Sequence, residues 1–482
     1  MDADRRNVNA DMAYGARSAS RPASSLSDPS GKLPRMESAT RSLPPAAGTI
    51  WYMGVKTRLL RGFIDGAIRE RLAAGTGEQR RRPLLVDLFA GTGIVGAEFA
   101  REAQVVAADA QSYAATLARS LLEPLPRRRR PDIDRDLGLE ADIGRSVLSC
   151  RYADELDAER AFLDAPDAEG PANVAAYRDH LASGGGICRH PAKELELVSR
   201  PGPIMTALYR NVYFGVRQAV EIDAWRDSIA CFVRRSADWG EPHGRRLATH
   251  YLAALLFAAS RATSGTSHFA QPRGLSKPSE VRAVLRRRRI DIAALFRARS
   301  AWLARELERR PPLAGHRAIA APHERLFLAL DARRDRPRVV YADPPYTQDN
   351  YSRFYHVLEV IDRHAVPRLA RDADGALLKG RYPVLGERFL SGFCMPDEVE
   401  REFRAVTRSA AERGAAVVWS YSETNGLLLK RWPRAERLDR LRALLLDSYR
   451  DVEIRQKPLH HSGSGDKNHE AMELLAIGDG PR

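Results

Sequence analysis

Residues 84–93 read Leu-Leu-Val-Asp-Leu-Phe-Ala-Gly-Thr-Gly, an apolar run that is broken only by Asp87 and ends in two glycines. Such a run is typical of a parallel strand that is buried on both faces. The glycines predict a tight turn, because they tolerate a positive φ and let the backbone approach a ligand closely. A helix over about 95–102 and a second strand over 104–109 are expected to follow. The stretch therefore predicts a strand–turn–helix–strand unit, the opening of an α/β sheet.

A second block of the same kind begins near residue 338. It is expected to begin with a buried strand over 338–343, followed by a helix over 397–413 that stops at Gly414 and a strand over 415–421. An amphipathic helix with Leu438, Leu441 and Leu445 on one face comes next. Two late strands, around 452–456 and 472–477, are expected to pair as a hairpin. Strands that alternate with helices predict a doubly wound, mostly parallel sheet.

The long stretch between the two blocks interrupts this alternation. It carries two runs of four arginines, Arg127–Arg130 and Arg286–Arg289, among several helix-like segments. The start of the chain is rich in Ser, Arg, Pro, Ala and Asp and has no apolar periodicity, which is typical of disorder. The predicted organisation is a disordered tail over 1–47, a sheet domain built from 48–124 and 336–482, and an inserted domain over 125–335.

The charge of the chain points to a polyanionic partner. Across 482 residues, 77 Lys and Arg outnumber 62 Asp and Glu, which gives a net charge of +15 and a pI near 9.9. Basic surface of this kind binds phosphate backbones by releasing their counterions. We therefore expect a nucleic acid as partner, with phosphate contacts from the two arginine runs.

Two other properties exclude whole classes of protein. No stretch approaches the roughly 20 apolar residues that a membrane span requires, so we expect no integral membrane segment. The four cysteines are far apart and form no Cys-x-x-Cys pair, which argues against a disulfide framework and against a zinc ribbon. This cysteine usage suits a reducing compartment, and the predicted location is cytoplasmic.

The glycine-rich turn predicts an adenosine-containing ligand. Asp109 ends the second strand, 22 residues after Asp87, where an acidic side chain can accept both ribose hydroxyls of such a ligand. A phosphate-binding P-loop would end in Gly-Lys-Ser/Thr, whereas Gly93 is followed by Ile94 and Val95. The turn therefore favours an adenosine ligand that is not held by its phosphates, and a tight turn without a ligand is the structural alternative.

The tetrapeptide Asp343-Pro-Pro-Tyr346 follows the second buried strand, where α/β sheets bind their ligands. Pro344 and Pro345 fix φ, so the Pro344 carbonyl and the Asp343 carboxylate are rigid acceptors beside the ring of Tyr346. Two acceptors take both N–H hydrogens of an amino group on a planar base, and the nitrogen lone pair then turns toward an electrophile. The ring stacks on the base, which must first flip out of a duplex.

With these motifs the sequence resembles the adenine-N6 DNA methyltransferases, in which the glycine-rich cofactor motif precedes Asp-Pro-Pro-Tyr. The resemblance rests on Asp87, Phe89, Gly91 and Gly93, on Asp343–Tyr346, and on Tyr52-Met-Gly54-Val-Lys56, which is similar to the family's Tyr-x-Gly-x-Lys element. It implies a Rossmann-like S-adenosylmethionine-dependent methyltransferase fold with a large inserted target-recognition domain. It also implies that Lys56 neighbours the methionine carboxylate of the cofactor, Phe89 packs on the cofactor and Asp109 holds its ribose.

A further resemblance lies in the predicted insertion. Residues 261–274, RATSGTSHFAQPRG, look like a family segment that ends Phe-x-x-Pro-x-Gly. In the family this segment belongs to the DNA-contacting target-recognition domain. The candidate DNA-binding residues are therefore Arg261, Phe269, Pro272 and Arg273. Ala270 stands where the family usually has Asn, which is a departure from the pattern.

The spacing of the motifs separates related classes of enzyme. Asp87 and Asp343 lie 256 residues apart, whereas small ribosomal-RNA guanine methylases with similar motifs have no large insertion between them. Cytosine-C5 methylation uses a Pro-Cys nucleophile, and no cysteine here follows a proline. We expect site-specific methylation of adenine N6 in DNA. Cytosine-N4 methylation, RNA base methylation and a DNA-binding protein with a degenerate methylase core stay as alternatives.

The expected partners follow from this reading. They are double-stranded DNA and, as a further candidate, a cognate restriction endonuclease. His460, His461 and His469 cluster near the C-terminus, but methyl transfer needs no Lewis acid, so we expect no metal site.

Overall fold

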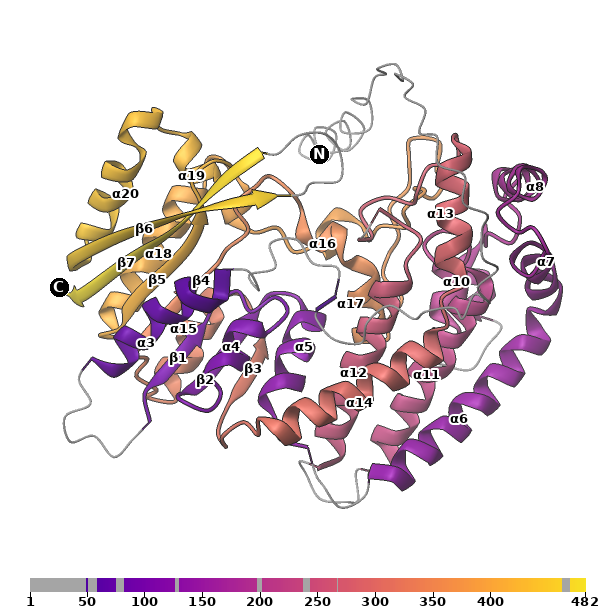
Figure 1. Ribbon diagram of the computed structural model, residues 1–482, viewed down its shortest axis with the longest axis horizontal. Coiled ribbons are helices and arrows are strands. Elements are labelled where there is room, and N and C mark those ends of the chain that lie inside the picture. The colour runs from indigo at the N-terminus through magenta and orange to yellow at the C-terminus, as the bar shows by residue number, and fades with distance from the viewer. Residues whose placement is uncertain are drawn as a thin grey trace, which may run out of the picture. The chain divides into compact units, whose positions relative to one another are not determined.

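The computed structural model describes residues 49–50, 59–74, 82–125, 130–196, 202–236, 243–266, 268–461 and 469–482 (Figure 1). The predicted tail over 1–47 lies outside these ranges, as does the element with Tyr52, Gly54 and Lys56. The side chains of Arg127–Arg130 and of the three C-terminal histidines also lie outside what is described.

A seven-stranded mixed sheet has the order β3-β2-β1-β4-β5-β7-β6. Its strands are β1 (Leu84–Asp87), β2 (Gln104–Asp109), β3 (Arg317–Ala320), β4 (Val339–Ala342), β5 (Ala416–Ser422), β6 (Tyr449–His461) and β7 (His469–Pro481). β1 pairs in parallel with β2 and β4, whereas β7 runs antiparallel between β5 and β6. The strand order reverses direction between β1 and β4, which is the point where open α/β sheets bind their ligands.

Alternate side chains of the central strands enter two separate cores. Leu84 and Val86 of β1 enter one core and Leu85 enters the other, as the two-residue period of a strand requires. Helices α15 (His323–Ala332), α18 (Val399–Glu412) and α20 (Arg437–Leu446) bury side chains in the first core, and α3 (Asp65–Ala73), α4 (Ile94–Phe99) and α5 (Ser112–Leu122) do so in the second. Because helices cover both faces of the sheet, the predicted α/β class is confirmed.

Most expected elements of the two blocks lie where the sequence predicts them. β2 spans the predicted residues 104–109, β6 and β7 form the expected hairpin, and Gly414 adopts a φ of 73° after α18. The helix predicted over 95–102 is shorter than expected. α4 ends at Phe99, whose carbonyl accepts the Ala103 N–H at 3.0 Å as the chain turns into β2.

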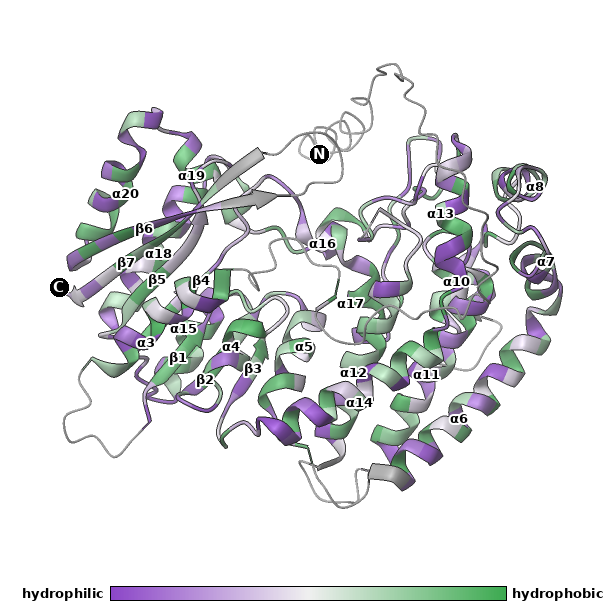
Figure 2. Cartoon of the chain, in the orientation of Figure 1, coloured by the Kyte–Doolittle hydropathy of each residue, from purple (hydrophilic) through white to green (hydrophobic). Residues whose placement is uncertain are grey.

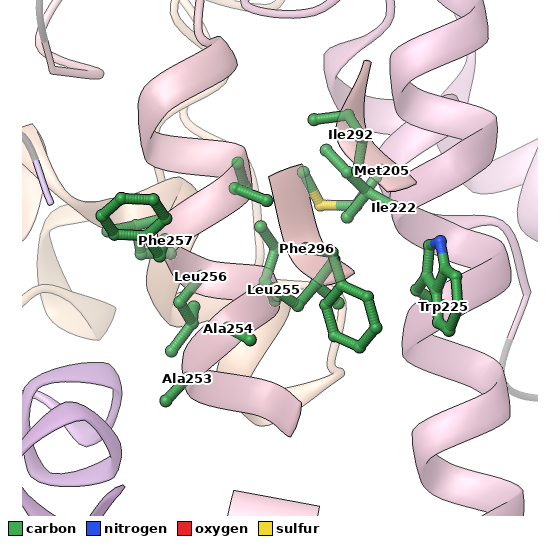
Figure 3. Close-up of a cluster of buried hydrophobic side chains, with 14 of the residues drawn as sticks. Met205, Ile222, Trp225, Ala253, Ala254, Leu255, Leu256, Phe257, Ile292 and Phe296 are labelled. Carbon is green, nitrogen blue, oxygen red and sulfur yellow. The ribbon is translucent and has the colours of Figure 1, made fainter. Parts of the chain in front are cut away.

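The described residues between 130 and 309 form helices. They are α6 (Arg130–Arg151), α7 (Ala153–Leu163), α8 (Pro171–Ala182), α9 (Pro191–Glu196), α10 (Ile204–Tyr209), α11 (Val216–Arg235), α12 (His243–Ala262), α13 (Pro278–Arg288) and α14 (Ile292–Arg309). Their core lies between α11, α12 and α14, where the rings of Trp225 and Phe296 are 4.3 Å apart beside Leu255 (Figure 3). Hydrophilic residues recur along these helices (Figure 2), and none in the described ranges is both long and apolar enough to cross a membrane.

The helical region ends earlier in the chain than the predicted boundary at residue 335. β3 pairs in parallel with β2, and α15 packs on the sheet, although both lie within the predicted insertion over 125–335. Conversely, α5 and α17 (His356–Arg363) contribute Tyr113 and Val357 to the core of the helical region. The residues from β3 onward therefore belong to the sheet, and the two parts share a core through α5 and α17.

Candidate functional site

Three carboxylates lie at the carboxyl edge of the sheet, on neighbouring strands. Asp87 ends β1, Asp109 ends β2 and Asp343 directly follows β4. Because β1 lies between β2 and β4, Asp87 lies between the other two acids. Burial raises the pKa of Asp87 to about 7, and the negative charges of Asp343 and then Asp109 add to this shift.

Asp87 is the most enclosed of the three acids. It is 1% exposed, and neither of its carboxylate oxygens accepts a hydrogen bond from a described residue. The N–H dipoles of Gly96 and Phe89 oppose the rise in its pKa only in part. A buried carboxylate without a partner is costly in its ionised form, so a cationic group placed here would stabilise it.

Asp109 holds the glycine-rich turn in place. Its two carboxylate oxygens accept the N–H of Gly91 at 3.0 Å and the N–H of Gln111 at 2.9 Å. The residue is partly exposed, yet its carboxyl lies deep enough that burial raises its pKa to about 6. An ionised carboxylate offers about four acceptor positions, so Asp109 still has capacity for the hydroxyls of a ligand.

Gly93 allows the turn to pack directly on α5. Its φ is 76°, and a Cβ at this position would lie 2.5 Å from the Cα of Ala118. Gly91 also has a positive φ, of 51°. Both positions therefore favour glycine because of their backbone conformation. At Gly93 a larger residue would also clash with α5.

Phe89 extends from this turn toward the other face of the sheet. Its ring packs edge-on against Phe393 at 5.3 Å and lies 6.0 Å from the ring of His323 at the start of α15. The ring is only partly buried, so one part of it faces the carboxyl edge region or solvent. The exposed part of the ring is the part that would contact a cofactor, as the sequence predicts.

The tetrapeptide after β4 presents the groups that the sequence singled out. Pro344 is buried, whereas Asp343, Pro345 and Tyr346 are partly exposed. The ring of Tyr346 packs against Tyr421 at 5.8 Å, and its carbonyl accepts the N–H of Leu427 at 2.9 Å. The Tyr346 ring thus packs on β5, and the residue is partly exposed.

The segment over 261–274 lies beside the chain that follows the tetrapeptide. Helix α16 (Tyr351–Phe354) begins five residues after Tyr346, and its Phe354 carbonyl accepts the N–H of Phe269 at 2.9 Å. The ring of His268 stacks on Phe354 at 4.7 Å. The structure therefore brings the 261–274 segment against the helix that follows the tetrapeptide.

Phe269 itself is an anchor of this segment. It is 1% exposed, its ring packs edge-on against Tyr213 at 5.4 Å, and its carbonyl accepts the Tyr213 hydroxyl at 2.7 Å. This burial differs from the direct DNA contact that the resemblance implies for Phe269. Pro272 and Arg273 of the same segment are partly exposed, and the Arg273 guanidinium donates to the Gly265 carbonyl at 3.0 Å.

No protein-family model, curated protein or solved structure matches this chain. What the site can bind therefore follows from its own residues and their charges.

Arginines gather beside this segment. Arg261 and Arg299 both lie over the ring of Phe257, at 5.8 and 4.2 Å, and Arg287 donates to the Arg261 carbonyl at 3.0 Å. Burial lowers the pKa of Arg287, and the positive charges of Arg261 and Arg273 lower it further. Three elements thus bring positive charge together: the end of α12, the 261–274 segment and α13.

The other arginines of the Arg286–Arg289 run make contacts within the protein, and phosphate contact from the run stays a prediction. Arg288 is buried and donates to the Tyr177 hydroxyl at 2.5 Å and to Asn211 at 2.6 Å. Arg289 donates to the Leu163 carbonyl at 2.9 Å, and Arg286 pairs with Glu169 at 3.0 Å. Only Arg287 of this run belongs to the cluster beside the candidate site.

Sequence reasoning missed Glu359, which connects the helical region to the start of α5, just after β2. Its carboxylate on α17 accepts the N–H groups of Ser112 and Tyr113, both at 3.2 Å, and so caps α5 just after Asp109. A single glutamate on an amphipathic helix carries no sequence signal for this role. The contact fixes the start of α5 against the chain that follows the tetrapeptide.

One group in the described part of the chain has the spacing of metal ligands. It consists of His323, Glu324 and Glu402, with His323 nitrogens 3.5 and 3.4 Å from the two carboxylates. Burial lowers the pKa of His323, while the two carboxylates oppose that change. Arg401 pairs with the second oxygen of Glu402 at 3.0 Å, so the group also acts as a network that joins α15 to α18.

Proposed function

We propose that this protein transfers a methyl group from S-adenosylmethionine to the N6 amino group of adenine in DNA. The observation that carries the proposal is the set of three carboxylates, Asp87, Asp109 and Asp343, at one edge of the sheet. Burial, and to a smaller extent repulsion from Asp343 and Asp109, raises the pKa of Asp87 to about 7. A ligand with a sulfonium and an ammonium group relieves this repulsion, whereas the phosphates of a nucleotide would increase it.

The arrangement of the sheet supports a cofactor of this kind. The five strands β3-β2-β1-β4-β5 are parallel and follow the doubly wound order of Rossmann-like folds. The reversal point between β1 and β4 lies between the Gly91–Gly93 turn and the tetrapeptide. A Rossmann-like methyltransferase fold with an inserted helical target-recognition region is therefore part of the proposal.

The chemistry rests on orientation. Bound S-adenosylmethionine would supply the electrophilic methyl group, and the protein would hold the amino group in line with it. The Asp343 carboxylate and the Pro344 carbonyl accept the two N–H hydrogens, and the accessible part of the Tyr346 ring stacks on the flipped base. Asp109 holds the ribose through its remaining acceptor positions, and Phe89 packs against the cofactor.

The nucleic-acid part of the proposal rests on charge beside the site. The chain has a net charge of +15, and Arg261, Arg273 and Arg287 lie near one another at the 261–274 segment, which contacts α16 through Phe269. A nucleic-acid strand whose phosphates bind these arginines would pass close to the tetrapeptide. We therefore expect a polyanion to bind at the predicted target-recognition segment.

Sequencing of modified bases tests the proposal in cells. DNA from a methylation-deficient host that expresses the protein should carry N6-methyladenine at one recurrent sequence, and DNA from a host with Asp343→Ala should not. Modified cytosine in the same position would point to the N4 alternative. Unmodified DNA from cells that contain folded wild-type protein would contradict the proposal.

Cofactor affinity is expected to rise with pH between about 5 and 7 and then to level off. The pKa values of Asp87 and Asp109 are raised to about 7 and about 6. A cationic ligand favours their ionised forms, so binding releases protons where the free acids are still protonated. Calorimetry across this pH range, in two buffers of different ionisation enthalpy, measures both effects.

Two variants control this pH experiment. Asp87→Asn should flatten the rise above pH 6, because it removes the group with the higher pKa. Asp109→Ala should instead weaken S-adenosylmethionine binding at every pH, because it removes the ribose acceptor. An affinity that is constant from pH 5 to 8 in the wild-type protein would speak against a cation among these acids.

DNA affinity is expected to fall steeply with salt, and the arginine cluster should account for part of the slope. The double variant Arg261→Gln/Arg273→Gln should make the slope of log K against log salt shallower by roughly two. Arg286→Gln is the matched control, since Arg286 lies next to Arg287 on α13 but pairs with Glu169. Fluorescence anisotropy at several salt concentrations measures the slopes, and equal slopes for all three proteins would exclude the cluster from DNA binding.

A further inference from the structure

An exposed apolar pair lies on the segment that covers α16. Phe389 is 42% exposed and Leu390 is 38% exposed. Phe389 is the one aromatic side chain among the exposed large hydrophobic residues of the described part of the chain. Because the two residues are consecutive, they form a small apolar surface that a partner can cover.

The backbone around this pair is held in place beside the candidate site. The Phe389 carbonyl accepts the hydroxyl of Ser352 on α16 at 2.8 Å, six residues after Tyr346 in the chain. Farther along, the Cys394 thiol donates to the Asp349 carbonyl at 3.3 Å. The segment therefore crosses the stretch that directly follows the tetrapeptide at two points.

Short turns on either side fix the position of the pair. The 3-10 turns η3 (Leu385–Glu387) and η4 (Gly392–Cys394) flank it, and Glu387 accepts the N–H and the guanidinium of Arg368 at 2.9 and 2.6 Å. Within η4, the ring of Phe393 packs edge-on against Phe89 of the glycine-rich turn. The exposed pair therefore lies on a segment that is held between α16 and the glycine-rich turn that contains Phe89.

The segment that carries the pair has an excess of basic residues. The segment over 364–391 contains five Lys and Arg against three Asp and Glu, and Arg388 directly precedes Phe389. The Tyr382 hydroxyl donates to the Ala270 carbonyl, which joins this segment to the 261–274 segment and its arginines. Apolar side chains amid basic ones match a base stack flanked by phosphates better than they match an apolar protein surface.

We infer that the side chains of Phe389 and Leu390 insert into the base stack of duplex DNA. They would fill the gap that the target base leaves when it flips out. This inference rests on the proposed function, because it assigns a role in flipping the base that the tetrapeptide receives. An inserted ring replaces the stacking lost by the neighbouring bases, so it stabilises the flipped state. Phe389 is a positioning residue in this role, since it contacts the neighbours of the target base and not the reacting atoms.

The test compares two duplexes that carry the recognition sequence found by sequencing. In one the target base is paired, and in the other it lies opposite an abasic site and flips at little cost. Phe389→Ala should lower methyl transfer to the paired duplex by about 10- to 100-fold and should approach wild-type transfer on the abasic duplex. Phe389→Trp should restore transfer to the paired duplex, and Leu390→Ala should show a smaller loss of the same pattern.

Val366→Ala is the matched control, because Val366 is 49% exposed on the same segment but no described contact ties it to α16. It should behave like the wild type on both duplexes. Equal transfer by wild type and Phe389→Ala on the paired duplex would overturn the inference, and so would a loss that the abasic duplex does not rescue. No methyl transfer by the wild type to either duplex would instead refute the proposed function.

Discussion

Asp343→Ala is expected to transfer no detectable methyl group, although it still binds S-adenosylmethionine and DNA. The carboxylate accepts an N–H hydrogen of the target amino group most strongly in the transition state, so its removal lowers turnover more than affinity. Loss of one such preorganised group costs on the order of 1000-fold in rate, about 4 kcal/mol. Single-turnover assays with labelled cofactor, combined with calorimetry for binding, separate the two effects.

Asp343→Asn is the companion variant. It keeps a carbonyl acceptor in nearly the same place but removes the charge that raises the pKa of Asp87. It should retain part of the turnover and shift the pH dependence of cofactor binding to lower pH. Near-wild-type turnover by Asp343→Ala would contradict the role assigned to the carboxylate, whatever base is modified.

Tyr346→Ala is expected to show the second-largest loss, and it should affect the base more than the cofactor. The variant removes the stacking face for the flipped base, worth on the order of 1–3 kcal/mol, or about 5- to 150-fold. It also removes a ring that packs against Tyr421 at 5.8 Å, so some loss of thermal stability accompanies it. Methyl transfer and melting temperature are measured on the same preparations.

Tyr346→Phe and Tyr346→Trp separate stacking from packing. Both keep an aromatic face, so both should retain much of the activity, and Tyr346→Phe should also keep the stability of the wild type. A large loss in Tyr346→Phe would show that the hydroxyl matters, and the stacking account would then be wrong.

The parts of the fold that the sequence predicts well are those with local signals. The apolar runs before Asp87 and Asp343 predict buried strands because a strand covered on both faces needs apolar side chains throughout. The two glycines predict the turn because no other residue adopts a positive φ so readily, and Gly93 also lies against Ala118. The candidate site follows from these signals because both motifs lie at strand ends.

The parts that the sequence could not predict depend on contacts between distant segments. β3 has the short sequence Arg-Ala-Ile-Ala at an edge of the sheet, so it contains no apolar run that would predict a strand. The inward packing of Arg288 depends on Tyr177 and Asn211, which lie far away in the sequence. Likewise, the repulsion among the three acids appears only when their strands are neighbours.

The product of methyl transfer tests the central claim most directly. Wild-type protein is incubated with duplex DNA and S-adenosylmethionine that carries a tritiated methyl group, and the DNA is then digested to nucleosides. The account predicts that the label elutes with N6-methyladenine and that Asp343→Ala incorporates none. Label in N4-methylcytosine would move the protein to the cytosine reading, and no label in DNA from a folded protein that binds the cofactor would contradict the account.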